Sequence, residues 1–386
     1  MTEAERREAS EPPFFTVTCA THAGGPRTGR IETAHGAVDT PCFLPIASHG
    51  SLRALSFEQA AACGSRLLMA NAWYIFGETG PERLRALGGA HGWMGWSGIL
   101  MTDSGGYQVF SLKDNSRITD NGVAFGDDAL LTPERVVEIQ RHLGSDIMLV
   151  LDDCAPYPCA DARAEEAVRR TSLWARRSMA AFQSTEPIQT RPQRIYGIIQ
   201  GSTRDALRRR SIDEVAGLGF DGYGIGGLSI GMPRSAIRAM TDLTSALLPA
   251  DRPRHLLGVG LPNQILEGIA DGADTFDCVL PIRKAQRGVA YTSTGERIYK
   301  RPDRQPDEPL DSRCGCPTCA SWSREALRRL FKSDKPRAGE LAAIHNLSFY
   351  HDTLAAARKA IRQARFDAFK DAFIDQWEAG EASGTR

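Results

Sequence analysis

The sequence predicts an α/β protein of the (β/α)8, TIM-type barrel class with a smaller subdomain at its C-terminal end. Three observations favour this fold. Eight short apolar runs alternate with helical patterns over about 250 residues, the usual size of such a barrel. Polar side chains or glycines follow most of these runs, and cysteines cluster beyond the last one. A doubly wound open sheet is the alternative, but no GxGxxG motif follows the first apolar run.

The apolar runs are continuous, as parallel strands covered by helices on both faces require. We expect eight strands at residues 42–46, 67–70, 98–101, 147–151, 195–199, 222–225, 255–259 and 275–280. Between them lie helical patterns with suitable ends. Thr132 can cap a helix that has Pro133 at its first position and Gly144 just past its end. Further helices are expected from Asp161 onward and over residues 203–218, 233–248 and 262–270.

Composition excludes several classes of protein. The 386 residues include 42% hydrophobic residues, which supports a large core, and no apolar run approaches the length of a membrane span. Lys plus Arg and Asp plus Glu number 47 each, so an anionic partner must be bound by a local patch. Nine cysteines without an N-terminal signal peptide fit a reducing compartment, and we expect a cytoplasmic protein.

The C-terminal ends of barrel strands are where chemistry gathers in this fold class. The sequence places four carboxylates, two amides and several glycines there. They are Asn71, Asp103, Asp152 with Asp153, Gln200, Gly226 with Gly227, Gly258 with Gly260, and Asp277. The number of polar groups at one mouth predicts a catalytic site.

The segment Asp103–Gln108, DSGGYQ, combines an acid with the groups that hold a planar polar molecule. Its two glycines allow close approach of the backbone, Tyr107 offers a face for stacking, and Gln108 offers a donor and an acceptor. The alternative is an Asx-turn in which Asp103 only caps its own loop.

A metal site is predicted from Cys314, Cys316, Cys319 and His345. Three thiolates and one imidazole form a closed tetrahedral zinc site, which leaves no position for substrate. We therefore expect one structural Zn²⁺, with three unpaired cysteines as the alternative. The predicted organisation is a disordered tail over 1–14, the barrel with an N-terminal strand cap over 15–305, and a zinc-binding subdomain with C-terminal helices over 306–386.

Two stretches are rich in basic residues. Seven basic residues and two acids lie between Arg283 and Arg304, and six basic residues and two acids lie between Arg324 and Arg337. Such stretches can form a surface that binds phosphate backbones. The alternative is a solvated face crossed by ion pairs.

Six motifs, in order, give the chain a close resemblance to bacterial tRNA-guanine transglycosylases from about residue 15 to about residue 360. They are DSGGYQ (103–108), LDDCAPYP (151–158), GIIQGS (197–202), GFDGYGIGGLSIG (219–231), FDCVLP (276–281) and the Cys3His set. The resemblance implies a barrel enzyme that exchanges the wobble guanine of certain tRNAs for a 7-deazaguanine. That base is 7-aminomethyl-7-deazaguanine, a queuosine precursor, in most bacteria.

The resemblance also implies roles for individual residues. Asp277 would be the nucleophile that attacks ribose C1′ and forms a covalent glycosyl-aspartate, and Asp103 the general acid/base. The remaining roles are to bind the base (Tyr107, Asp152, Gln200, and the backbone of Gly227 and Leu228) and neighbouring nucleotides (Arg283 and Arg287). The implied partners are tRNA, a 7-deazaguanine base and a second copy of the chain, with a heteromer as the alternative.

The chain departs from the family pattern at several positions. Met232 stands where the family usually has a glutamate that fixes the Leu228 backbone, which makes queuine a second candidate for the incoming base. Ala326 and Arg329 replace an aromatic residue and a histidine that accompany Trp322 in the family's dimer contact. These departures favour a divergent paralogue.

Two other functions are weighed against base exchange. A non-catalytic tRNA-binding subunit would be expected to lose its acids, whereas Asp103 and Asp277 are both present. A glycoside hydrolase on the same barrel would need neither a basic face nor paired groups that read the edge of a base.

Overall fold

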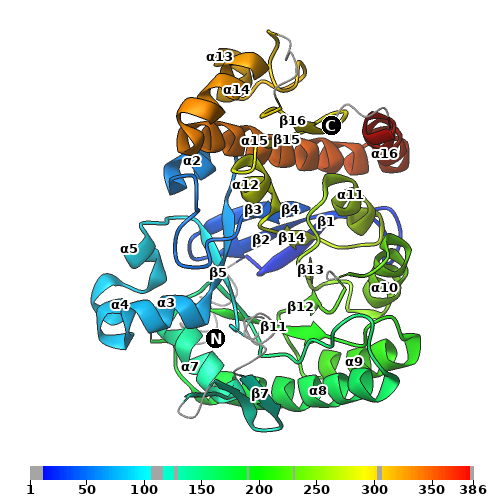
Figure 1. Cartoon of the computed structure of the whole chain (residues 1–386). Helices are drawn as coiled ribbons and strands as arrows, with labels where there is room; N and C mark the ends of the chain where they lie inside the picture. The colour runs from blue at the N-terminus through cyan, green and yellow to red at the C-terminus, as the bar shows by residue number, and fades with distance from the viewer. Residues whose placement is uncertain are drawn as a thin grey trace.

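The computed structural model describes residues 12–105, 116–125, 129–188, 191–228, 231–301 and 307–382. At its centre lie eight parallel strands, one at each apolar run of the sequence (Figure 1). In chain order they are β4 (Cys42–Leu44), β5 (Leu67–Asn71), β6 (Ile99–Asp103), β10 (Ile147–Leu149), β11 (Arg194–Ile199), β12 (Gly222–Ile225), β13 (Arg254–Leu256) and β14 (Thr275–Asp277).

The sheet closes on itself. The last strand, β14, pairs with the first, β4. Beyond β4 the chain pairs with β5 through the Ala47 N–H, which donates to the Met69 carbonyl (2.7 Å), and the Met69 N–H, which donates to the Pro45 carbonyl (3.1 Å). The predicted (β/α)8 barrel is therefore confirmed, and the doubly wound open sheet was the wrong alternative.

Strands β4, β10, β13 and β14 each end earlier than their apolar runs, and the cause is visible in the last two. Strand β13 stops at Leu256 because Gly258 takes a positive φ of 70°, which leaves the strand conformation. Strand β14 stops at Asp277, and Val279 is already in the helical region. At these two strand ends the Gly258 N–H donates to the Asp277 carboxylate.

Helices follow most barrel strands. The predicted helix after Thr132 is α7 (Pro133–Leu143): Thr132 accepts from the Arg135 N–H, and Gly144 ends the helix in the left-handed region. The others around the barrel are α2 (Phe57–Ala62), α3 (Ala72–Thr79), α4 (Pro81–Leu87), α5 (Ala90–Met94), α8 (Asp161–Ser184), α9 (Asp205–Ala216), α10 (Arg234–Leu247), α11 (Pro262–Ala270) and α12 (Leu280–Ala285). None of the helices in the described ranges has the length and apolar character needed to cross a membrane.

An antiparallel sheet of β1 (Phe15–Ala20), β2 (Arg27–Thr33) and β3 (Gly36–Thr40) precedes the barrel. It is fixed to the N-terminal end of β14 by a buried pair, in which Arg27 donates to both oxygens of Asp274 at 2.9 and 2.6 Å. The sheet therefore lies at the end of the barrel opposite the strand ends that carry the predicted site.

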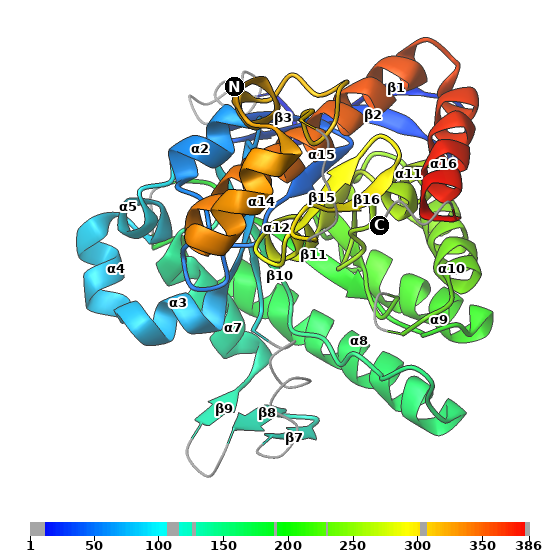
Figure 2. The same cartoon turned by 45° about the horizontal axis from the view of Figure 1, so that its top comes forward.

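Two smaller sheets are inserted in the barrel sequence. Strands β7 (Ser116–Thr119), β8 (Gly122–Phe125) and β9 (Ala129–Leu131) follow β6 and project beside α7 and α8 (Figure 2). The hairpin of β15 (Val289–Thr292) and β16 (Gly295–Ile298) follows α12.

The C-terminal region consists of α13 (Pro317–Ser321), α14 (Arg324–Ser333), α15 (Lys335–Arg362) and α16 (Phe366–Ala382). The long helix α15 runs across the barrel (Figures 1 and 2). Its Tyr350 ring lies 4.7 Å from the ring of Phe43 in β4. The same hydrophobic core contains Phe43 and Phe276 of the barrel with Leu347 of α15, so the two parts share one core. The predicted boundary at residue 305 falls outside the described residues.

Candidate active site

The neighbouring ends of β5 and β6 bring an amide and an acid together. Asn71 and Asp103 are paired in the strand register, and the Asn71 Nδ2 donates to the Asp103 Oδ1 at 2.6 Å. The Asn71 Oδ1 accepts from the Tyr74 N–H at 2.9 Å and so caps α3. The amide is thereby held at both ends and fixes the orientation of the acid.

Asp103 also accepts from the Gly105 N–H at 2.9 Å, where Gly105 has a φ of 82°. Asp103 therefore does cap its own loop, as the alternative of an Asx-turn predicts, and it also binds Asn71 on the neighbouring strand. Burial raises the pKa of Asp103 to about 7; the Gly105 bond opposes this rise, and the nearby charges of Asp277 and Asp152 add to it. An acid with this pKa can both give and take a proton near neutral pH.

Asp152 and Gln200 form a second acid–amide pair. They follow β10 and β11, and the Gln200 Nε2 donates to the Asp152 Oδ2 at 2.7 Å. Burial raises the pKa of Asp152 to about 6, against the lowering effect of the Gln200 bond. Gly227 lies against the same amide: with a φ of 70°, an added Cβ would stand 2.4 Å from the Gln200 Oε1. Leu228 follows with a fully buried side chain.

Asp277 ends β14 and is only 8% exposed. Its Oδ1 accepts from the Gly258 N–H at 2.9 Å and lies 3.1 Å from the Nε2 of His255, which is fully buried in β13. His255 is not among the residues for which the sequence predicts a role. A histidine at the start of the apolar run 255–259, one strand away from the predicted nucleophile, was the signal that could have found it.

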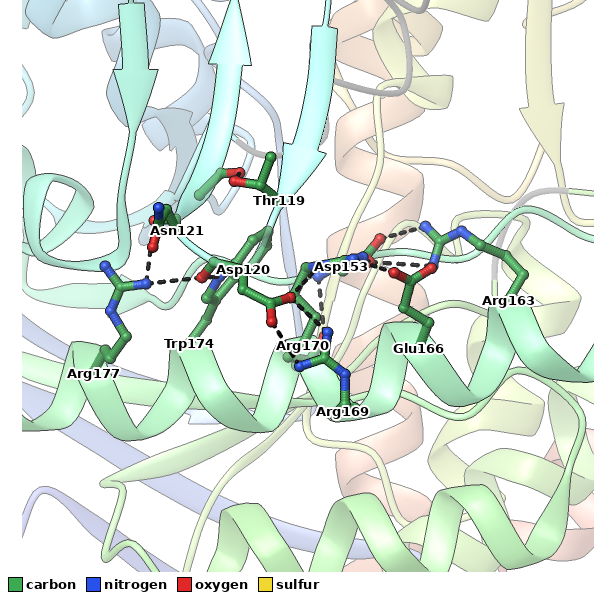
Figure 3. Close-up of polar contacts among 12 residues, drawn as sticks. Thr119, Asp120, Asn121, Asp153, Arg163, Glu166, Arg169, Arg170, Trp174 and Arg177 are labelled. Atoms are coloured by element: carbon green, nitrogen blue, oxygen red, sulfur yellow. Dashed lines mark hydrogen bonds and ion pairs between the residues drawn. The ribbon is translucent and has the colours of Figure 1, made fainter.

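Asp153, next to Asp152, belongs to a polar network on α8 (Figure 3). Its fully buried carboxylate binds the guanidinium groups of Arg163 and Arg170. Arg170 also lies 3.4 Å from Asp120 in the β7–β8 turn, whose carbonyl accepts from the Trp174 Nε1 at 2.9 Å. The network therefore ties the small sheet to the segment that carries Asp152.

We expect Asp153→Asn to lower the free energy of unfolding by about 3 kcal/mol, because it leaves two guanidinium groups without their buried anion. The matched control is Asp120→Asn, whose carboxylate is 52% exposed; its loss should cost less than about 1 kcal/mol. Urea denaturation measures both values. Equal losses in the two variants would contradict the assignment of Asp153 as the buried centre of the network.

The two basic stretches differ in the structure. In the second one, Arg324, Arg328, Arg329 and Arg337 form ion pairs with Glu308, Glu325 and Glu340. That stretch therefore matches the alternative, a solvated face with ion pairs. In the first, Arg283 and Arg287 are exposed in and just after α12, which begins three residues after Asp277. Neither has an ion-pair partner among the described residues.

The four predicted metal ligands meet in space. The ligand atoms of Cys314, Cys316, Cys319 and His345 all lie within 4.8 Å of one another and could hold a metal ion. The His345 Nδ1 faces the sulfurs of Cys319 (3.2 Å) and Cys316 (3.6 Å). The His345 Nε2 lies 2.7 Å from the Tyr291 carbonyl. A carbonyl only accepts, so Nε2 carries the proton and Nδ1 is free to bind a metal.

Tyr107 and Gln108 lie outside the described residues. Met232 is partly buried and packs against the main hydrophobic core, so an apolar side chain fills the position at which the family pattern has a carboxylate.

The chain is similar to known proteins over most of its length. The family "Queuine tRNA-ribosyltransferase" matches residues 21–379. The chain is 41% identical to the queuine tRNA-ribosyltransferase of Solidesulfovibrio magneticus, over 95% of this chain and 99% of the relative. It is 42% identical to that of Nitratidesulfovibrio vulgaris, over 91% and 94%, and 39% identical to that of Thermoanaerobacter pseudethanolicus, over the same shares.

Proposed function

We propose that this chain, which belongs to the queuine tRNA-ribosyltransferase family, exchanges the wobble guanine of tRNA for a 7-deazaguanine base. The observation that supports this most strongly is the gathering of Asp103, Asp152 and Asp277 at one barrel mouth, where burial raises the pKa of Asp103 and the charges of the other two acids add to the rise. One acid can attack while another moves protons, as in a retaining glycosidase.

In the first half-reaction, an oxygen of Asp277 attacks ribose C1′ and the bond from C1′ to guanine N9 breaks. The electron pair leaves with the guanine, and Asp103 in its acid form supplies the proton that neutralises it. In the second, N9 of the incoming base attacks C1′, its proton passes to Asp103, and the ester bond breaks to restore the Asp277 carboxylate. Atoms and electrons balance over the two steps without a redox cofactor or a nucleoside triphosphate.

Base recognition is assigned to the Asp152–Gln200 pair, which presents acceptors and donors to the polar edge of a purine. The backbone of Gly227, which lies against the Gln200 amide, and that of Leu228 are assigned to the substituents of the base, and Tyr107 is assigned to its face. The target base must leave the anticodon stack to reach the mouth. Arg283 and Arg287, exposed in the segment that follows Asp277 in the sequence, are assigned to the neighbouring phosphates.

Zinc is assigned to Cys314, Cys316, Cys319 and His345, because a set of three thiolates and one imidazole suits Zn²⁺ and fills its tetrahedral shell. With all four positions taken by protein, the metal supplies no step of the exchange. It holds α13 to α15 and so stabilises the C-terminal region.

The incoming base is assigned to the 7-deazaguanines, with 7-aminomethyl-7-deazaguanine and queuine as the two candidates. Met232 favours a paralogue with altered preference, because an apolar side chain cannot accept from the backbone that would read an aminomethyl group. A cytoplasmic location, and assembly as a homodimer or heteromer, remain predictions from the sequence.

The test is incorporation of labelled guanine into unmodified tRNA, with unlabelled guanine, 7-aminomethyl-7-deazaguanine and queuine as competitors. We expect exchange in tRNAs that have a wobble guanine, and a clear preference for queuine if Met232 alters the site. Exchange with unchanged preference for the aminomethyl base would remove the role of Met232. No exchange at all would favour the alternative function, that of a non-catalytic tRNA-binding subunit.

Asp103→Asn is expected to abolish exchange and to stabilise the fold above pH 7. The raised pKa of Asp103 means that the folded state of the wild type binds this proton more tightly than the unfolded chain does. The stability that the bound proton contributes to the wild type is therefore fully present below about pH 4 and is lost as pH rises through about 7. Asparagine keeps the Oδ1 that accepts from Asn71 and Gly105 but carries no charge.

Melting temperatures across pH 4 to 8 measure this effect. The variant should melt above the wild type at pH 8, and the difference should narrow toward pH 4. A difference that does not change with pH would show that Asp103 is not held protonated in the fold.

A further inference from the structure

Two donors converge on a single oxygen of Asp277. The Gly258 N–H and the His255 Nε2 both contact Oδ1, at 2.9 and 3.1 Å. An oxygen that already receives two hydrogen bonds is a poorer nucleophile than one that receives fewer, because its lone pairs are engaged. In the described part of the chain no donor is recorded on Oδ2. Oδ2 is therefore the oxygen that is placed to attack C1′.

His255 is itself held in one orientation. It pairs with Thr275 in the β13–β14 register, and its Nδ1 lies 2.8 Å from the Thr275 Oγ1. A carboxylate only accepts, so the Nε2 carries the proton; in a neutral imidazole the Nδ1 then accepts, and the Thr275 hydroxyl donates to it. This assignment satisfies all three buried groups and gives a chain of donors from Thr275 through His255 to Asp277.

We propose that His255 is a positioning residue for the nucleophile: through its bond to Oδ1, it directs Oδ2 of Asp277 at ribose C1′. This inference rests on the proposed base exchange. In the glycosyl-aspartate, Oδ2 forms the ester bond and Oδ1 becomes the ester carbonyl, which still accepts from His255. When the incoming base breaks the ester bond, the returning electron pair makes a carboxylate, and the two donors on Oδ1 stabilise its charge.

Substitution separates positioning from packing. His255→Phe keeps an aromatic ring of similar size but removes the donor, and His255→Gln keeps an N–H donor on a flexible chain. We expect the phenylalanine variant to lose about 100-fold in kcat, with KM for guanine within about twofold of wild type. Glutamine should recover most of the lost kcat. Thr244→Val, which removes a buried hydroxyl from α10, is the control and should leave kcat unchanged.

The readouts are steady-state exchange of labelled guanine and the rate at which a denaturation-resistant tRNA–protein complex forms. If folded His255→Phe exchanges at the wild-type rate, or if glutamine restores nothing, the inference is overturned. If the phenylalanine variant does not fold, Thr275→Val decides: it keeps the imidazole but removes the hydroxyl that holds Nδ1 and so orients the ring, so kcat should fall severalfold, and an unchanged kcat overturns the inference. A wild-type protein without any exchange would instead refute the proposed function.

Discussion

Asp277→Asn is expected to abolish both base exchange and the covalent tRNA complex. An amide oxygen is a far weaker nucleophile than a carboxylate, so the step that forms the ester bond should fall below detection. The fold should persist, because asparagine retains an Oδ1 that accepts from the Gly258 N–H and the His255 Nε2. Labelled-guanine incorporation and denaturing gels of protein with tRNA measure the two losses.

The control for this variant is binding without chemistry. Asp277→Asn should bind tRNA with nearly wild-type affinity in a filter assay, because Arg283 and Arg287, not Asp277, are assigned to the phosphates. Normal exchange by the variant would show that another acid attacks C1′. If the variant loses both tRNA binding and exchange, the loss of exchange cannot be assigned to the nucleophile. A melting curve would then show whether the variant had unfolded.

Removal of zinc is expected to cause the largest loss of stability. Structural zinc contributes about 10 kcal/mol or more of apparent binding free energy in small domains, and the ligand His345 lies in α15, the helix that shares the barrel core. Cys319→Ser, or treatment with a strong chelator, should therefore lower the melting temperature of the whole chain and release the metal measured by elemental analysis. Re-addition of Zn²⁺ should reverse the effect of the chelator.

Cys19→Ser is the matched control, because Cys19 lies in β1 and outside the metal group. It should retain one zinc per chain and a wild-type melting temperature. A Cys319→Ser protein with full zinc and unchanged stability would contradict the assignment of the site. At a temperature where the zinc-loaded and the partly zinc-depleted protein both remain folded, zinc loss should not change kcat per folded molecule, since the metal takes no part in the exchange.

The arrangement of the barrel was predictable because its signals are local. Continuous apolar runs mark buried parallel strands, and Thr132, Pro133 and Gly144 mark both ends of α7 with side-chain and backbone chemistry that depends on few neighbours. The early ends of β13 and β14 were less evident, because the apolar runs continue past the point at which Gly258 and Val279 leave the strand conformation.

The site was predictable in its list of acids but not in their surroundings. That Asp103 both caps its own loop and faces two other acids depends on β5, β6, β10 and β14 together, which no local pattern contains. The donor role of His255 likewise depends on the register between β13 and β14. The second basic stretch differs in this respect, because most of its ion pairs are local. Arg328, Arg329 and Arg337 pair with acids three or four residues away on α14 and at the start of α15, which is the spacing of neighbours on one helix face.

In the proposed mechanism, Asp277 carries the ribose during exchange. To locate the ribose, the complex of wild-type protein with unmodified tRNA is trapped, both are digested, and the adduct is identified by mass spectrometry. The expected result is a ribose-linked mass on the peptide that contains Asp277, and only in the absence of free guanine or a 7-deazaguanine to discharge it. An adduct on the peptide that contains Asp103, or exchange without any adduct, would contradict the mechanism.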